Sequence, residues 1–519
     1  MPWAILGGSS RSLVTTSHLT SVIMGSLVQN YIGGGWRSAS STATHSVKNP
    51  ASGVEIAQVP LSTSSDVDAA VRAAKAAFPG WRSTPSPVRA RVLFRLKALL
   101  EEHKEELAVQ LTEEHGKILA ETRGEVQRGI ENVEHACGVP TLMMGDTVEE
   151  ISKGIDSASW RQPLGVFGII TPYNFPVMIP LWFWPYAVAT GNTVVLKPSE
   201  QDPLTHQKIV SLAREAGLPD GVLNVVHGGR EVVETMCDHP DIEGVSFVGS
   251  SDVAKIVYTR AGAAGKRVQT LGGAKNFLIV MPDADMDATL DACAGSIFGS
   301  SGQRCLAGSV VVGIGDAHHQ IRERILDYAS SIRIGDGLES TTQMGPVISG
   351  THRDRVKEFI NQGVADGATL ALDGRGATVK GLEGGYWVGP TVFENVAPDM
   401  SIVSEEIFGP VASINRADSV EDAIEMMHSN RYGNACSLFT TSGHAAREFR
   451  YQAGISMVGI NIGVAAPMAF FPFGGSRQSF FGDLKAAGKD GIAFYTDQRV
   501  VISRWSAVKA DPHNLPRNS

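Results

Sequence analysis

One cysteine of this chain stands where a thiol could act as a nucleophile. Cys305 ends the segment Gly302-Gln303-Arg304-Cys305, which closes a glycine-rich turn after a helix-like run at residues 286–298. The thiolate is the reactive form of cysteine, and an adjacent cation such as Arg304 lowers the pKa of a thiol. Glycines in the turn let another molecule come close to the backbone. The alternative is a small buried hydrophobic residue, the commoner role of a lone cysteine.

A second candidate is the asparagine in Thr171-Pro172-Tyr173-Asn174-Phe175-Pro176. Two prolines stiffen this loop, and a fixed side-chain amide is the hydrogen-bond donor that an oxyanion requires. The alternative is an asparagine that only shapes a turn.

Two strand ends carry groups suited to a dinucleotide. Lys197-Pro198-Ser199-Glu200 follows an apolar run, and both charged side chains could hydrogen-bond ribose hydroxyls. Glu200 would repel a 2′-phosphate, which favours NAD over NADP, although two solvated loop charges are the alternative. Phe247-Val248-Gly249-Ser250 ends a strand and opens a helix, whose first N–H groups suit a pyrophosphate. The glycine-closed strand at residues 221–229 does not form the Gly-x-Gly-x-x-Gly fingerprint.

The elements that must position these residues alternate between strand and helix. Helices are expected at residues 66–78, ending at Pro79-Gly80, at 87–114 and at 120–136. Short apolar runs at 166–170, 193–196, 222–226 and 244–247 alternate with helical segments, which predicts a parallel sheet of Rossmann type. A second α/β region follows and carries Cys305. Residues 147–160 and the C-terminal stretch to 506 read as strands that leave the main cores.

The composition limits the class of protein. A chain of 519 residues needs two or three domains, and a net charge of −9 offers no general attraction to nucleic acid or an anionic membrane. Five scattered cysteines are typical of a reducing compartment, and no Cys-x-x-Cys or His-Glu-x-x-His spacing supports a metal site. Residues 162–196 lack charged side chains, but five prolines interrupt them, so we expect no membrane span.

The first 23 residues are rich in serine and threonine and have one charged side chain, Arg11. We interpret residues 1–23 as a disordered or non-native extension before a start at Met24, and we expect a cytoplasmic protein. The alternative is a transit peptide that directs the chain to the mitochondrial matrix.

Seven segments, taken in order, resemble the aldehyde dehydrogenase superfamily over residues 30–505. They are Thr171 to Pro176, Lys197 to Glu200, Phe247 to Ser250, Leu271-Gly272-Gly273-Ala274-Lys275-Asn276, Gly302 to Cys305, Glu405-Glu406-Ile407-Phe408-Gly409-Pro410 and Pro472-Phe473-Gly474-Gly475. The resemblance implies an α/β fold with an NAD-binding domain (24–146 and 161–270), a catalytic domain (271–470) and a small β oligomerisation arm (147–160 and 482–506). A homotetramer or homodimer is also implied.

The resemblance also implies a role for each matching residue. Cys305 would be the nucleophile, and the Asn174 side chain with the Cys305 N–H would form the oxyanion hole. The implied NAD-binding residues are Thr171, Pro172, Tyr173, Phe175, Lys197, Ser199, Glu200, Gly229, Phe247, Gly249, Ser250, Gly272, Glu406 and Phe408.

One departure from the family pattern concerns the residue before Leu271-Gly272-Gly273. Hydrolytic members have a glutamate there that activates water, whereas this chain has Thr270, which cannot be a general base near neutral pH. In this respect the chain resembles the methylmalonate-semialdehyde dehydrogenase branch, which transfers its acyl group to coenzyme A. In that branch arginines matching Arg128 and Arg304 hold the substrate carboxylate, a group that guanidinium binds in a bidentate manner. The alternative for Arg128 is an ion pair with Glu125 or Glu131 on its own helix.

The implied reaction is NAD-dependent oxidation of malonate or methylmalonate semialdehyde, with decarboxylation and acyl transfer from Cys305 to coenzyme A. A water-using aldehyde dehydrogenase and a non-catalytic relative are the alternatives. The sequence leaves open the 2-methyl preference and the pathway, whether valine, inositol or β-alanine breakdown.

Overall fold

The structure, a computed structural model, describes residues 26–505. Its first large sheet has eight strands in the order β22-β12-β11-β8-β9-β10-β2-β3, of which the central five are parallel. The strands are β22 (Phe480–Phe481), β12 (Arg267–Leu271), β11 (Ile242–Val248), β8 (Val166–Ile170), β9 (Thr193–Lys197), β10 (Leu223–Val225), β2 (Asn30–Ile32) and β3 (Gly35–Arg37). The predicted Rossmann-type sheet is therefore present.

Helices cover both faces of this sheet, which explains why its central strands are apolar throughout. Val166 and Ile170 of β8 pack with α1 (Ser64–Ser83), α9 (Arg230–Asp238) and α10 (Ser251–Ala263). Phe167 and Ile169 face a second core. That core includes residues of α2 (Ser86–Glu102), α3 (Lys104–His115), α4 (Leu119–Ala136), α5 (Val139–Leu142), α6 (Met178–Leu181), α7 (Trp184–Ala189) and α8 (Leu204–Glu215).

The chain changes direction within the sheet at β8. It adds β9 and β10 on one side, and then returns to add β11 and β12 on the other side of β8. The carboxyl ends of β8, β9 and β11 consequently meet at a topological switch point, where doubly wound sheets bind ligands. The loops that follow these three strands begin at Thr171, Pro198 and Gly249.

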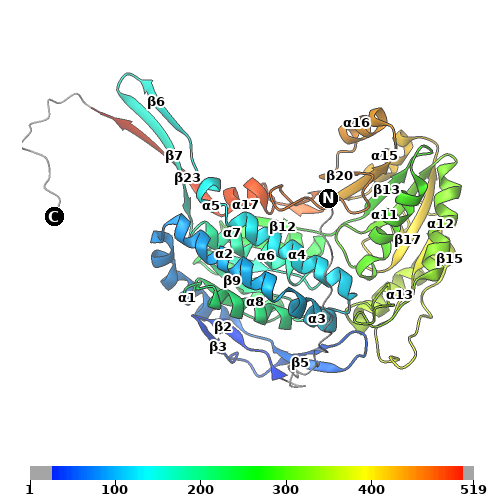
Figure 1. The fold of residues 1–519 in the computed structure, drawn as a ribbon, viewed down its shortest axis with the longest axis horizontal. Coiled ribbons are helices and arrows are strands. Elements are labelled where there is room, and N and C mark those ends of the chain that lie inside the picture. The colour runs from blue at the N-terminus through cyan, green and yellow to red at the C-terminus, as the bar shows by residue number, and fades with distance from the viewer. Residues whose placement is uncertain (1–25, 506–519) are drawn as a thin grey trace, which may run out of the picture.

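The second large sheet has seven strands in the order β15-β16-β17-β14-β13-β19-β20, all parallel except β15. They are β15 (Thr369–Leu372), β16 (Thr391–Glu394), β17 (Val411–Ala417), β14 (Gly308–Ile314), β13 (Asn276–Val280), β19 (Ala435–Phe439) and β20 (Met457–Ile460). Its helices are α11 (Met286–Phe298), α12 (Ala317–Ser331), α13 (Gly350–Ala365), α14 (Ser401–Ser404), α15 (Val420–His428) and α16 (Gly443–Gln452). The two sheets lie side by side in the molecule (Figure 1).

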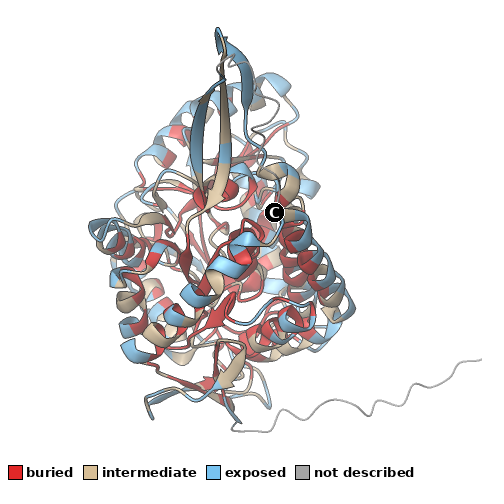
Figure 2. Cartoon of the chain, turned by 90° about the vertical axis from the view of Figure 1, so that its left-hand side faces the viewer, coloured by how far each residue is buried: buried red, intermediate tan, exposed pale blue. Residues whose placement is uncertain are grey.

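A three-stranded sheet projects from the body as a long arm (Figure 1). It consists of β23 (Thr496–Arg504), β7 (Ile155–Pro163) and β6 (Thr147–Ser152), and β6 is exposed along its whole length (Figure 2). Residues 482–495, predicted to belong to the arm, precede its last strand. Within them α17 (Gly488–Phe494) packs against the body, where the buried Tyr495 hydroxyl contacts Ser246 over 2.8 Å.

Two small sheets complete the strands of the described chain. One has the order β1-β5-β4, and the other pairs β18 with β21. Their strands are β1 (Ser26–Leu27), β5 (Glu55–Pro60), β4 (Thr44–Lys48), β18 (Tyr432–Gly433) and β21 (Ser476–Arg477).

Two helix boundaries differ from prediction. α1 does not end at Pro79-Gly80 but continues to Ser83, because the buried Trp81 anchors its last turn by donating its indole N–H to the Val188 carbonyl over 2.8 Å. The helix predicted at residues 87–114 is two helices that meet at His103. Within residues 26–505 no helix is long and apolar enough to span a membrane. The extension at residues 1–23 lies outside the described residues.

Candidate active site

Cys305 lies in a tightly wound loop between α11 and β14. α11 ends at Phe298, as the sequence predicts, and a single 3₁₀ turn, η1 (Gly299–Gly302), follows. Ser300, Ser301 and Gly302 have φ angles of 50°, 53° and 71°, a left-handed run that costs free energy for the two serines. Hydrogen bonds offset this cost, since Ser300 N donates to Glu121 Oε1 over 2.6 Å and Ser301 Oγ to the Gly345 carbonyl over 2.6 Å.

Two cavities meet at Cys305. Among the residues that the structure describes, Cys305 alone lines both of them. The first, here the polar cavity, has a volume of about 530 Å³ and lies over the switch point of the first sheet. Its walls include Asn174, Glu200, Ser250, Glu406 and Phe408. The second, here the apolar cavity, has a volume of about 440 Å³ and lies beside α4. Its walls include Phe175, Trp182, Leu306, Phe471 and Phe473. A group bound at the sulfur can therefore be approached from two chemically different sides.

The environment of the thiol does not make it as acidic as its sequence context predicted. Burial and, less strongly, the carboxylate of Glu406 raise the pKa of Cys305, while the Cys305 N–H, the cation of Arg304 and the Leu306 N–H lower it, and the resulting pKa is about 12. Arg304 changes the thiol pKa less than burial or Glu406 does, because its guanidinium is directed to Glu121, at 2.9 Å, and to the Ser300 hydroxyl, at 3.1 Å. Arg304 therefore lowers the pKa of the thiol, as the sequence predicts, but burial and Glu406 outweigh it.

The structure brings most of the predicted NAD-binding residues together. Eight of them line the polar cavity: Pro172, Tyr173, Glu200, Gly249, Ser250, Gly272, Glu406 and Phe408. Phe175 lines the apolar cavity instead. Five line neither cavity, namely Thr171, Lys197, Ser199, Gly229 and Phe247.

Three of the residues outside the cavity walls, Lys197, Gly229 and Phe247, have a local reason for their position. Lys197 lies under the wall and holds Glu200 with an ion pair of 2.8 Å. Burial alone would raise the pKa of Glu200, but this lysine lowers it below its ordinary value. Gly229 caps α9, and the ring of Phe247 fills the space beside the Gly249 Cα.

The polar cavity has the features of a dinucleotide site. Ser250 is the N-cap of α10, a 13-residue helix whose first N–H groups face the cavity wall formed by Ser250, Ser251 and Asp252. Gly272 and Gly273 keep the floor open, since a Cβ at Gly272 would meet Ser251 Oγ at 2.7 Å and one at Gly273 would contact the Glu406 carboxylate. Glu406 accepts the Ala274 N–H over 2.8 Å, and burial raises its pKa to about 7.

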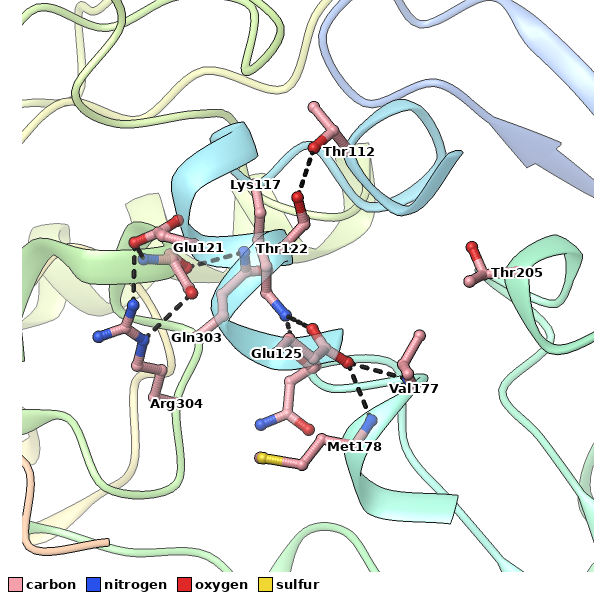
Figure 3. A network of polar contacts seen from close by, with 12 residues as sticks. Thr112, Lys117, Glu121, Thr122, Glu125, Val177, Met178, Thr205, Gln303 and Arg304 are labelled. Carbon is pink, nitrogen blue, oxygen red and sulfur yellow. Dashed lines mark hydrogen bonds and ion pairs between the residues drawn. The ribbon is translucent and has the colours of Figure 1, made fainter. Parts of the chain in front are cut away.

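The two predicted carboxylate-binding arginines both line the apolar cavity with Cys305. Arg128 lies on α4, donates to the Pro467 carbonyl over 2.6 Å and is 3.8 Å from Glu131, the weaker of its contacts. Arg304 is held by Glu121, which lies about two turns before Arg128 on α4, as Figure 3 shows for the Glu121–Arg304 pair. Both guanidinium groups are thus fixed at the wall of the cavity that contains the nucleophile.

The two carboxylates that line the apolar cavity, Glu121 and Glu125, already have hydrogen-bond and ion-pair partners. Glu125 is fully buried, forms a 2.6 Å ion pair with Lys117 and accepts the Val177 and Met178 N–H groups over 2.9 and 3.2 Å (Figure 3). It does not pair with Arg128, because Lys117 occupies it. Glu121 accepts from Arg304 and from Ser300 N.

Thr270 lines neither cavity. It is completely buried in β12, and its hydroxyl donates to the Phe481 carbonyl of β22 over 3.2 Å. Its role is to join two strands of the first sheet, and neither its position nor its chemistry suits proton abstraction.

Several polar wall residues had no signal in the sequence. His45, Asp252, His352, Arg355 and Arg431 come from four separate segments and meet only in the folded polar cavity. Burial lowers the pKa of His352 to about 4, so this imidazole is neutral near pH 7. No group of three or more His, Cys, Asp or Glu side chains within residues 26–505 is placed to hold a metal ion.

Comparison with known proteins identifies the origin of this geometry. The sequence profile of the aldehyde dehydrogenase family matches residues 36–501 of the chain. The chain belongs to the aldehyde dehydrogenase family. The α/β fold with its Rossmann-type and second parallel sheets is accordingly the fold of that family.

The similar proteins within the family carry related names. Malonate-semialdehyde dehydrogenase 2 of Geobacillus kaustophilus (strain HTA426) is 49% identical over 92% of this chain and 99% of its own length. A crystal structure of methylmalonate-semialdehyde dehydrogenase from Oceanimonas doudoroffii has a TM-score of 0.91 and 45% identity, and covers 93% of this chain and 99% of that chain. An NAD complex from Sinorhizobium meliloti 1021, assigned as a methylmalonate-semialdehyde dehydrogenase, has a TM-score of 0.93 and 41% identity, covering 94% and 100%.

Proposed function

We propose that the chain oxidises malonate or methylmalonate semialdehyde with NAD, releases carbon dioxide and passes the remaining acyl group from Cys305 to coenzyme A. The products would be acetyl-CoA or propanoyl-CoA. The observation that carries the proposal is the replacement of a general base by Thr270, whose hydroxyl is engaged inside the sheet. The names of relatives at 45–49% identity support the substrate class.

Binding would place the aldehyde in the apolar cavity with its carboxylate against Arg128 and Arg304. Bidentate guanidinium contacts would hold the carboxylate and leave the aldehyde carbon beside the sulfur. NAD, held in the polar cavity by Glu200, Ser250 and Glu406, would accept a hydride when bound.

Cys305 would attack the aldehyde carbon, and the Asn174 amide with the Cys305 N–H would stabilise the oxyanion that forms. Oxidation of this adduct leaves a thioester on the cysteine. A carboxylate in the β position to a carbonyl loses carbon dioxide readily, because the carbonyl accepts the electron pair.

Transfer to coenzyme A then exchanges one carbon–sulfur bond for another. The coenzyme A thiolate adds to the thioester carbon, the bond to Cys305 breaks, and the cysteine leaves as a thiolate that takes up a proton. Hydrolysis would instead require a base to activate water. On the apolar side both candidate carboxylates are engaged, Glu121 by Arg304 and Glu125 by Lys117.

The domain and assembly predictions accompany this proposal. We propose that residues 24–146 and 161–270 bind NAD and that 271–470 carry the nucleophile. The arm would join subunits of a homodimer or homotetramer, and its strands carry exposed apolar side chains such as Val148, Val500 and Ile502. Five free thiols support a reducing location, which we propose to be the cytoplasm.

The test is a steady-state assay of malonate semialdehyde, methylmalonate semialdehyde and propanal, each with and without coenzyme A. We expect the two semialdehydes to give continuous NADH formation only with coenzyme A, and no more than one NADH per active site without it. Continuous coenzyme A-independent turnover would contradict acyl transfer. Propanal, which lacks a carboxylate, should be the poorest of the three substrates.

A water-using aldehyde dehydrogenase is the second candidate, and one observation favours it. Glu406 lines the polar cavity with Cys305, and burial raises its pKa to about 7, the range of an effective general base. If turnover without coenzyme A occurred, and Glu406→Gln abolished it while still forming one NADH per active site, Glu406 would be that base.

A further inference from the structure

The carbonyl oxygen of Cys305 accepts hydrogen bonds from two side-chain amides. Asn276 at the start of β13 and Asn434, between β18 and β19, each donate through Nδ2 over 2.9 Å. Both asparagines are buried, with 3% and 4% of their surface exposed. Because a carbonyl has two lone pairs, these bonds satisfy the oxygen fully.

Both asparagines are fixed to the second sheet, Asn276 through its side chain and Asn434 through its main-chain carbonyl. Asn276 Oδ1 accepts the Ala435 N–H over 3.0 Å, and its Nδ2 also donates to the Ala307 carbonyl over 2.9 Å. The Asn434 carbonyl accepts the N–H of Met457 over 3.1 Å. The nucleophile loop is therefore tied to β13, β19 and β20 through one oxygen atom.

That oxygen belongs to the same planar peptide unit as the Leu306 N–H. The direction of the N–H follows from the direction of the oxygen. The Leu306 N–H acts on the Cys305 sulfur and lowers the pKa of its thiol. Hydrogen bonds donated to an amide oxygen polarise the peptide and make its N–H a stronger donor.

We propose that Asn276 and Asn434 are positioning residues for the nucleophile, which hold and polarise the Cys305–Leu306 peptide so that its N–H stabilises the thiolate. The inference rests on the proposed role of Cys305, and it assigns one contact that favours the thiolate in a site where burial and Glu406 both oppose the negative charge. The two asparagines act on the sulfur through the backbone, without touching substrate.

The test measures thiolate formation directly and does not depend on turnover. The full chain, without NAD, is alkylated with iodoacetamide between pH 6 and 10, and modification is followed on the Cys305 peptide by mass spectrometry. The other four cysteines are buried, which favours selective reaction. Because the pKa of Cys305 is about 12, this range lies below the midpoint, and the rates at equal pH are compared. For Asn434→Ala the pKa should rise by about 0.4–1 unit, the effect of one hydrogen bond, so alkylation should be about three- to tenfold slower throughout the range.

Asn192→Ala is the matched control. Asn192 is also buried and donates through Nδ2 to a backbone carbonyl, that of Tyr495, over 2.7 Å, but it lies in the first sheet's domain. We expect it to lower the thermal midpoint without moving the alkylation profile. The proposal is overturned if Asn434→Ala leaves the profile unmoved, or if Asn192→Ala moves it equally. Asn276→Ala should shift the profile in the same direction, and Asn434→Ala keeps the test decisive if the Asn276 variant does not fold.

A second measurement, NADH formation by Cys305→Ala, separates this inference from the proposed function. If Cys305 were not the nucleophile, Cys305→Ala would still form NADH, whatever the alkylation profile. If only the positioning role were wrong, Cys305→Ala would be inactive while Asn434→Ala titrated like the unmodified chain.

Discussion

Replacing Arg128 by methionine should convert a selective enzyme into one that treats acidic and neutral aldehydes alike. Arg128 donates to the Pro467 carbonyl over 2.6 Å and to the Met468 sulfur over 3.3 Å, and it makes a longer contact with Glu131. A guanidinium has five N–H donors, so the others are available to a ligand in the apolar cavity. A charge-assisted hydrogen bond contributes about 1.5–3 kcal/mol. Loss of about 2–3 kcal/mol corresponds to a decrease of about 30- to 150-fold in kcat/KM for malonate semialdehyde.

The measurement is kcat/KM for malonate semialdehyde and for propanal in the presence of NAD and coenzyme A. Methionine keeps an unbranched apolar stem but removes the guanidinium, so the ratio between the two substrates should fall by the full factor while propanal changes by less than about threefold. Arg123→Met is the control, because Arg123 lies on the same helix but pairs with Glu105 at the surface, over 2.8 Å. An equal loss for both aldehydes, or a similar loss in Arg123→Met, would refute carboxylate recognition by Arg128.

Further predictions concern the thiol, the oxyanion and the buried charges. Cys305→Ala should form no NADH in a stopped-flow assay, and Asn174→Ala should lower kcat by about 10²- to 10³-fold; a loss below about fivefold would remove Asn174 from the oxyanion hole. Glu406→Gln removes a negative charge that raises the Cys305 pKa, so alkylation at equal pH should be faster, and an unchanged rate would contradict that coupling. In the unmodified chain NAD affinity should increase as the pH rises through about 7, because the ionised Glu406 is the better acceptor for ribose hydroxyls. Calorimetry measures this affinity, and the glutamine variant should lack the pH dependence. Lys117→Met leaves the Glu125 carboxylate buried and unpaired, so urea unfolding should show a loss of about 3–5 kcal/mol, and a loss below about 1 kcal/mol would be inconsistent with the network of Figure 3.

The sequence predicted those parts of the fold that local patterns determine. α11 has the predicted bounds of Met286 and Phe298, because an N-cap at Asp285 and the glycines after Phe298 are local signals. The path of α1 through Pro79 could not be predicted, since it depends on Trp81 reaching a carbonyl more than a hundred residues away. Long-range anchoring of this kind outweighs local propensity.

The residues of the candidate site can likewise be divided into those that the sequence predicts and those that it does not. Glu200, Ser250 and Glu406, which belong to motifs that the sequence shows, line one cavity; Glu200 follows β9 and Ser250 precedes α10. The direction of the Arg304 side chain was not predictable, because it depends on Glu121 from α4, which had no motif of its own. Asn434 was missed for a similar reason, since its partner is a backbone oxygen 129 residues earlier.

The meeting of two cavities at a single sulfur atom makes the route of any reagent measurable. An electrophile with a carboxylate should travel along the arginine-lined side, so NAD in the opposite cavity will not shield the cysteine from it. A bulky polar electrophile that enters over Glu200 and Ser250 must compete with the dinucleotide. Protection by NAD thus reports the direction of approach, and inhibitors of this enzyme can be built for either entrance.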